Sequence, residues 1–104
     1  MNEPFEEYTS LADLFRKLAS PVRLALIAEL DDKGERCVHE LVDALDISQP
    51  LVSQHLKILR DARIVKAGRR GREMVYTLAD EHVTTILRDG IVHTREQCGI
   101  DDEK

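Results

Sequence analysis

The sequence of 104 residues contains no apolar run that approaches the roughly 20 residues needed to cross a membrane. Its first residues lack the basic start and the apolar stretch of a signal peptide. It has only two cysteines, Cys37 and Cys98, which form no CxxC pair. These absences predict a cytoplasmic protein with reduced thiols and no membrane partner. A phosphate loop and a nucleophile–base pair are also missing, so we expect neither an enzyme nor a small-molecule substrate.

Acidic residues outnumber basic residues, and the formal net charge is −5. The charge is unevenly distributed, because the segment from Lys57 to Arg72 holds seven basic residues and a single acid, Asp61. Such a basic block predicts a nucleic-acid contact in an otherwise acidic chain. A solvated charged face is the alternative reading of this segment.

Apolar residues at helical spacing predict helices over about residues 10–18, 21–30, 38–45 and 49–62. The last two are short and are joined by the turn at 46–48, which is the plan of a helix-turn-helix, placed at 38–62. Within 49–62, Val52, Leu56 and Leu59 share the inward face. This helix is the predicted recognition helix.

Two β-prone runs surround a loop with two glycines at 64–78 and predict a hairpin with three arginines at its tip. A final helix is predicted at 80–98, with Asp80 as its cap. Residues 1–9 are expected to be a flexible arm and residues 99–104 an acidic tail. The expected fold is a single domain, mostly α with a small β-hairpin, of the winged helix-turn-helix type.

Polar residues of the recognition helix are expected to face the major groove, and wing arginines the backbone or a minor groove. The predicted DNA-binding residues are Gln49, Ser53, Gln54, His55, Lys57, Arg60, Arg69, Arg70 and Arg72. For His55, a plain solvated surface position is the alternative.

The last helix carries four side chains that can bind a metal ion, Asp80, His82, His93 and Glu96. At 100° per residue, His93 lies about 20° and Glu96 about 40° from His82 around the helix, so the three share one stripe. At 1.5 Å per residue, however, the two histidines are roughly 16 Å apart along the axis, too far for one ion. One chain therefore carries two half-sites. The alternative is a capping Asp80 with two solvent-facing histidines.

Four motifs in order resemble the ArsR/SmtB family of bacterial metal-responsive repressors over about residues 10–98. They are Leu18-Ala-Ser-Pro-Val-Arg23, Cys37-Val-His-Glu-Leu41, Leu51-Val-Ser-Gln-His-Leu-Lys-Ile-Leu59 and Gly71-Arg-Glu-Met-Val-Tyr76. The resemblance implies a homodimer, paired through its N- and C-terminal helices, that binds operator DNA without metal and leaves it on binding a metal.

The zinc-sensing branch of the family pairs Asp-x-His of one chain with His-x-x-Glu of the other, and Asp80, His82, His93 and Glu96 match this pattern. Antiparallel pairing of the helix with its twofold mate would place each half-site beside the other half-site of the partner and so form two equivalent sites. Two imidazoles and two carboxylates suit tetrahedral Zn²⁺, and such a set also accepts Co²⁺.

Cys37 and His39 occupy positions that supply a soft-metal site in thiolate-using relatives, although residues 1–20 contain no Cys or His to complete it. A buried structural Cys37 is the preferred interpretation, and a second metal site with Cys37 and His39 remains an alternative. For the function of the protein, a redox- or small-molecule-responsive repressor that uses Cys37 is a further alternative. A dimeric metal-binding interaction module without DNA binding is the third alternative.

Overall fold

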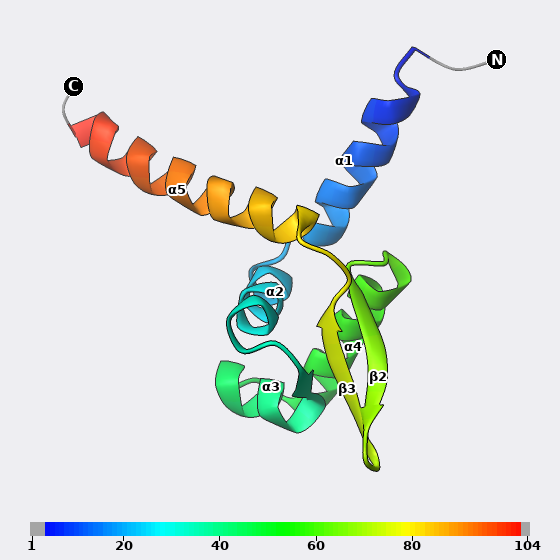
Figure 1. Ribbon diagram of the computed structural model, residues 1–104. Helices are drawn as coiled ribbons and strands as arrows, with labels where there is room; N and C mark the ends of the chain where they lie inside the picture. The colour runs from blue at the N-terminus through cyan, green and yellow to red at the C-terminus, as the bar shows by residue number, and fades with distance from the viewer. Residues whose placement is uncertain (1–3, 103–104) are drawn as a thin grey trace.

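The computed structural model describes residues 4–102. Five helices and three strands occur in this part of the chain, in the order α1 (Glu6–Leu18), α2 (Pro21–Lys33), β1 (Arg36–Cys37), α3 (Val38–Leu45), α4 (Gln49–Asp61), β2 (Val65–Arg70), β3 (Glu73–Leu78) and α5 (His82–Asp102). Helices α1 and α5 diverge on one side of the body, whereas the β2–β3 hairpin points to the opposite side (Figure 1). The predicted winged helix-turn-helix is confirmed.

Local sequence signals explain where the central helices begin and end. The Ser20 hydroxyl accepts a hydrogen bond from the Arg23 N–H, and Pro21 occupies the first turn of α2. Likewise, the Ser48 hydroxyl caps α4 by accepting from the Leu51 N–H. Between α3 and α4, Asp46 adopts the left-handed conformation (φ 56°) that lets the chain turn sharply.

The three strands form an antiparallel sheet in the order β1-β3-β2. The hairpin of β2 and β3 was expected, and its tip places Arg70 opposite Glu73 across Gly71 and Arg72. Strand β1 was not expected, because two residues are too few to show a strand period. It pairs Cys37 with Val75 and so joins the start of α3 to the wing.

The core lies between α2, α3, α4 and the sheet. Its fully buried side chains are Leu26, Ile27, Leu30, Leu41, Val52, Leu56 and Leu59. Val52, Leu56 and Leu59 therefore face inward as expected, which turns the polar face of α4 toward solvent.

The terminal helices differ from expectation in their limits. Helix α1 begins at Glu6, inside the range 1–9 expected to be an arm, since Glu6 and Glu7 complement the positive end of the helix and the Thr9 hydroxyl donates to the Phe5 carbonyl. Helix α5 begins at His82, two residues after the expected start, and extends to Asp102, inside the expected tail.

Candidate DNA-binding surface and metal half-sites

Helix α4 presents most of its predicted DNA-binding residues to solvent. Gln49, Ser53, Gln54, Lys57 and Arg60 are all exposed. Amides and hydroxyls at these positions can donate to and accept from base edges, whereas the two cations suit phosphates. Lys57 also forms an exposed ion pair of 3.1 Å with Asp61, one turn later on the same helix.

His55 differs from its neighbours on α4, because it is partly buried and hydrogen-bonded within the domain. Its Nδ1 accepts a hydrogen bond of 3.1 Å from Arg23 Nε, and Arg23 Nη1 donates to the Lys17 carbonyl at 2.9 Å. Burial, and next the Arg23 charge, lower the pKa of His55 below its usual value of 6.5. The neutral ring thus carries its proton on Nε2, the nitrogen left for other partners. Sequence reasoning missed this link between α1, α2 and α4.

The three wing arginines have different environments. Arg69 and Arg72 are exposed at the tip. Arg70 is exposed too, but it donates from Nη2 to Glu40 at 3.0 Å and to Glu73 at 3.3 Å. Glu40 lies in the first turn of α3, so this pair bridges the helix-turn-helix and the wing. Sequence reasoning missed Glu40, which is 30 residues away from Arg70 in the chain.

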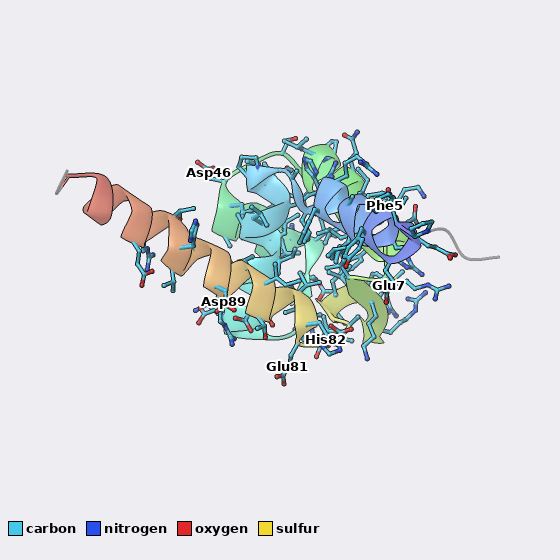
Figure 2. The ribbon with its side chains drawn as sticks, turned by 90° about the horizontal axis from the view of Figure 1, so that it is seen from above. Phe5, Glu7, Asp46, Glu81, His82 and Asp89 are labelled. Atoms are coloured by element: carbon cyan, nitrogen blue, oxygen red, sulfur yellow. The ribbon has the colours of Figure 1, made fainter. Side chains whose placement is uncertain are left out.

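The candidate metal-binding residues lie just before α5 (Asp80) and along it (His82, His93 and Glu96), and within the chain the two predicted half-sites remain separate. Glu81 directly precedes α5, and its carbonyl accepts the Thr85 N–H. Asp80, one residue earlier, accepts a hydrogen bond of 2.9 Å from the His82 N–H through one carboxylate oxygen and so satisfies the first N–H group of the helix. The side chains of Asp80, His82, His93 and Glu96 are exposed. No group of three or more metal-binding side chains meets within the described residues. Figure 2 shows His82 in the first turn of α5, which continues well beyond the body of the domain.

The donor set of the two half-sites nevertheless fits zinc. Two imidazole nitrogens and two carboxylate oxygens are ligands that Zn²⁺ takes in tetrahedral sites. All four groups are at the surface, where a second chain can reach them without repacking of the core. The Asp80 carboxylate keeps its second oxygen for a metal while the first accepts the His82 N–H.

Cys37 and His39 belong to no group of three or more metal-binding side chains in the part of the chain that the structure describes. Cys37 is buried at the end of β1, whereas His39 is exposed one residue into α3. The Cys37 N–H donates to Glu40 Oε1 at 2.9 Å as part of a capping box. These contacts support the structural interpretation of Cys37.

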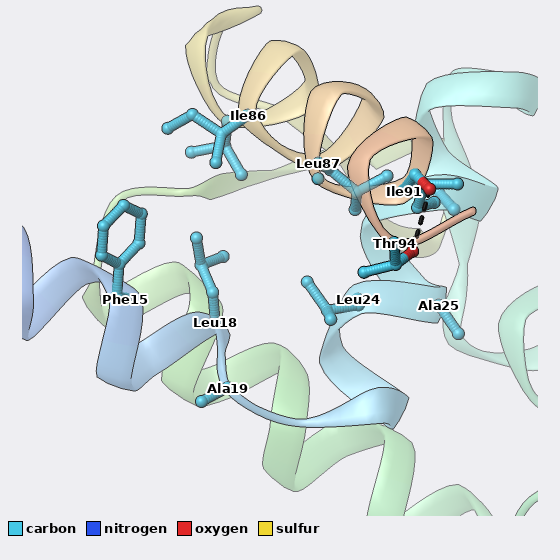
Figure 3. Close-up of a pocket in the computed structure, with 12 residues that line it drawn as sticks. Phe15, Leu18, Ala19, Leu24, Ala25, Ile86, Leu87, Ile91 and Thr94 are labelled. Carbon is cyan, nitrogen blue, oxygen red and sulfur yellow. Dashed lines mark hydrogen bonds between the residues drawn. The ribbon is translucent and has the colours of Figure 1, made fainter. Parts of the chain in front are cut away.

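An apolar groove runs between α1, α2 and α5 (Figure 3). Its volume is about 570 Å³, and its walls include Phe15, Leu24, Ile86 and Ile91, each more than a third exposed. On α5, Arg88 holds the helix against α2 by donating to both carboxylate oxygens of Asp31, at 2.9 and 2.7 Å. The groove therefore leaves a large apolar surface uncovered.

No helix in the described part of the chain is both long enough and apolar enough to span a membrane.

The chain resembles known transcription regulators in sequence and in structure. Residues 20–67 match the family described as "Bacterial regulatory protein, arsR family". The HTH-type transcriptional repressor SmtB of Mycobacterium tuberculosis is 50% identical over 95 residues, which cover 91% of this chain and 70% of that protein. A cadmium resistance transcriptional regulatory protein, the CadC homolog of Staphylococcus aureus, is 30% identical over 86% of this chain and 74% of its own.

Among solved structures, a homodimeric winged helix-turn-helix DNA-binding domain from Mycobacterium bovis superimposes with a TM-score of 0.79. It is 25% identical to this chain, and the match covers 92% of this chain and 89% of that one.

Proposed function

Since the chain belongs to the ArsR/SmtB family of DNA-binding transcription repressors, we propose that it is a zinc-responsive repressor. A homodimer occupies operator DNA without metal and leaves it when zinc binds to two sites between the subunits. The observation that carries this proposal is the placement of His82, His93 and Glu96 on one exposed helix, with Asp80 exposed just before its start and the histidines too far apart to share an ion.

The dimer is supported by the uncovered groove. Phe15, Leu24, Ile86 and Ile91 leave apolar surface in water that a second copy of the chain would bury. The homodimeric Mycobacterium bovis domain has the same fold. A twofold axis that pairs α5 with its mate in antiparallel orientation would set each Asp80–His82 beside the His93–Glu96 of the partner.

DNA binding would use α4 and the wing. Gln49, Ser53 and Gln54 suit base edges, and His55 can offer its Nε2–H. Lys57 and Arg60 suit phosphates, as do Arg69 and Arg72 at the wing tip.

Zinc would act as a cross-link that fixes one arrangement of the two α5 helices. Asp80 and His82 would bind it from one chain, and His93 and Glu96 from the other; Co²⁺ suits the same ligands. Because α5 is attached to α2 through Arg88 and Asp31, a change in the pairing of the α5 helices would move each recognition helix with its domain. Release of the operator requires a coupling of several kcal/mol between the two equilibria.

A zinc titration of operator-bound protein, followed by fluorescence anisotropy, tests the proposal. The wild-type protein should leave the DNA as zinc rises, whereas H82A and H93A should bind DNA and stay bound. Operator binding by the wild type that does not respond to zinc would contradict the zinc-responsive function. Absence of DNA binding would instead favour an interaction module.

Mixing the two variants tests whether the site lies between subunits. Each H82A or H93A homodimer lacks a histidine in both sites, but a mixed dimer places both substitutions in one site and leaves the other intact. After exchange of subunits, about half of the dimers should hold one zinc ion each. If each site lay within one chain, mixing would restore no zinc binding.

A further inference from the structure

The wing tip is attached to the helix-turn-helix by one guanidinium group. Arg70 is the last residue of β2, and its Nη2 lies 3.0 Å from Glu40 Oε1 and 3.3 Å from Glu73 Oε1. Glu73 is its partner across the hairpin, whereas Glu40 belongs to α3. Arg70 thus joins two elements that hold different parts of the DNA-binding surface.

Glu40 is itself held firmly at the start of α3. Its Oε1 accepts the Cys37 N–H at 2.9 Å, and its Oε2 lies 3.6 Å from Arg36 Nη1. The bond from the Cys37 backbone, and next the one from Arg70, lower the pKa of Glu40 to about 2. The carboxylate is therefore charged at neutral pH and cannot follow Arg70 elsewhere without losing the cap of α3.

The contact between Arg70 and Glu40 lies near the free end of the hairpin, beyond the part that β1 supports. Strand β1 supports the wing at the Cys37–Val75 pair, and β2 and β3 continue past that point to the Arg70–Glu73 pair. Arg70 and Glu40 fasten this overhanging part, close to Gly71 and the tip. They thereby fix the distance between the wing tip and the helix-turn-helix, which must match the spacing of DNA grooves.

We infer that Arg70 is a positioning residue of the wing and not a phosphate ligand, and that Glu40 is its anchor. This inference rests on the DNA-binding surface proposed above. Phosphate contacts at the tip are left to Arg69 and Arg72, which are exposed like Arg70 but form no ion pair among the described residues. Sequence alone placed the three arginines in one class, and the contact with Glu40 separates Arg70 from the other two.

The two roles of Arg70 predict opposite effects of removing the Glu40 charge. If Arg70 positions the wing, E40Q loosens the tip and weakens operator binding. If Arg70 binds phosphate, E40Q releases a competing carboxylate and strengthens binding. Glutamine is a suitable substitute, because it also serves at this position of a capping box and so retains the bond from the Cys37 N–H.

The experiment measures operator affinity of the metal-free protein at several salt concentrations for wild type, E40Q, R70Q and the double variant. We expect E40Q and R70Q each to weaken binding about threefold to tenfold, and the double variant to be no weaker than R70Q, because both remove one contact. The slope of log affinity against log salt should match the wild type in all three. R69Q and R72Q should each reduce that slope by about 1, as loss of a phosphate contact does.

D43N is the matched control, because Asp43 is an exposed acid on the same helix and forms no ion pair among the described residues. It should leave affinity unchanged or slightly increase it. Unchanged or tighter binding by E40Q, or a slope reduced by about 1 in R70Q, would overturn the inference. These affinities are measured without zinc, so a protein that fails to respond to zinc would not affect the test of Arg70 and Glu40. Loss of operator binding by the wild type itself would reject the DNA-binding surface instead.

Discussion

Replacing Arg23 with alanine should lower the free energy of unfolding by about 3 kcal/mol. The substitution removes two hydrogen bonds from a charged donor, one of 2.9 Å to the Lys17 carbonyl and one of 3.1 Å to His55 Nδ1. Bonds to charged groups contribute about 1.5–3 kcal/mol each, and the lower end applies because Arg23 is only partly buried. The loss also leaves His55 Nδ1 and a carbonyl at the end of α1 without their protein donor.

Urea denaturation followed by circular dichroism, at one fixed protein concentration, measures this loss. R16A is the control, because Arg16 is an exposed arginine whose 3.4 Å contact with Asp13 should contribute less than about 0.5 kcal/mol. In a double-mutant cycle, R23A and H55A should be coupled by about 1 kcal/mol. A loss in R23A as small as that in R16A, or additivity with H55A, would show that Arg23 does not fasten α4 to α1 and α2.

Three further predictions concern helix α4 and Cys37. L56A should lower the free energy of unfolding by about 2–5 kcal/mol in urea denaturation, because Leu56 is 1% exposed. Leu51 is 37% exposed on the same helix, so L51A should lower it by less than about 1 kcal/mol. Similar losses in the two variants would contradict the orientation of α4. NMR titration of His55 should give a midpoint below pH 6.5, because burial and the Arg23 charge lower its pKa. The contribution of the neutral ring to the stability of the fold should be complete above pH 6.5 and lost as pH falls through the lowered pKa. A midpoint above pH 6.5 would contradict the burial of His55 beside Arg23. C37S should keep both zinc stoichiometry and zinc-driven operator release, since Cys37 is buried, and loss of either would assign it to sensing.

The fold could be predicted because its signals are local. Ser20-Pro21 and Ser48 cap helices within three residues, and the inward stripe of α4 follows from helical spacing alone. The glycine at the first position of the wing turn, Gly71 with φ 66°, is typical of a two-residue hairpin loop. None of these features depends on a distant part of the chain.

The roles of individual polar residues could not be predicted, because their partners are distant in sequence. His55 meets Arg23 across 32 positions, and Arg70 meets Glu40 across 30. No periodicity relates such pairs, and only the packing of α2 against α4 and of the wing against α3 brings them together. As a result, His55 and Arg70 looked equivalent to their exposed neighbours in sequence, and the structure alone gives them internal partners.

The proposed metal site on α5 follows from the sequence pattern, and it would be incomplete in one chain. Around this helix, Val83 and Leu87 lie about 100° and 140° from His82, and they face the groove beside α2. The stripe of His82, His93 and Glu96 runs along the edge of that apolar face, where Ile86 is exposed. A partner helix that covered the groove would therefore meet the metal-binding stripe at the border of the interface. Burial of apolar surface would set the pairing, and the ligands would lie where the two chains meet, which is why a metal at this border could alter the dimer.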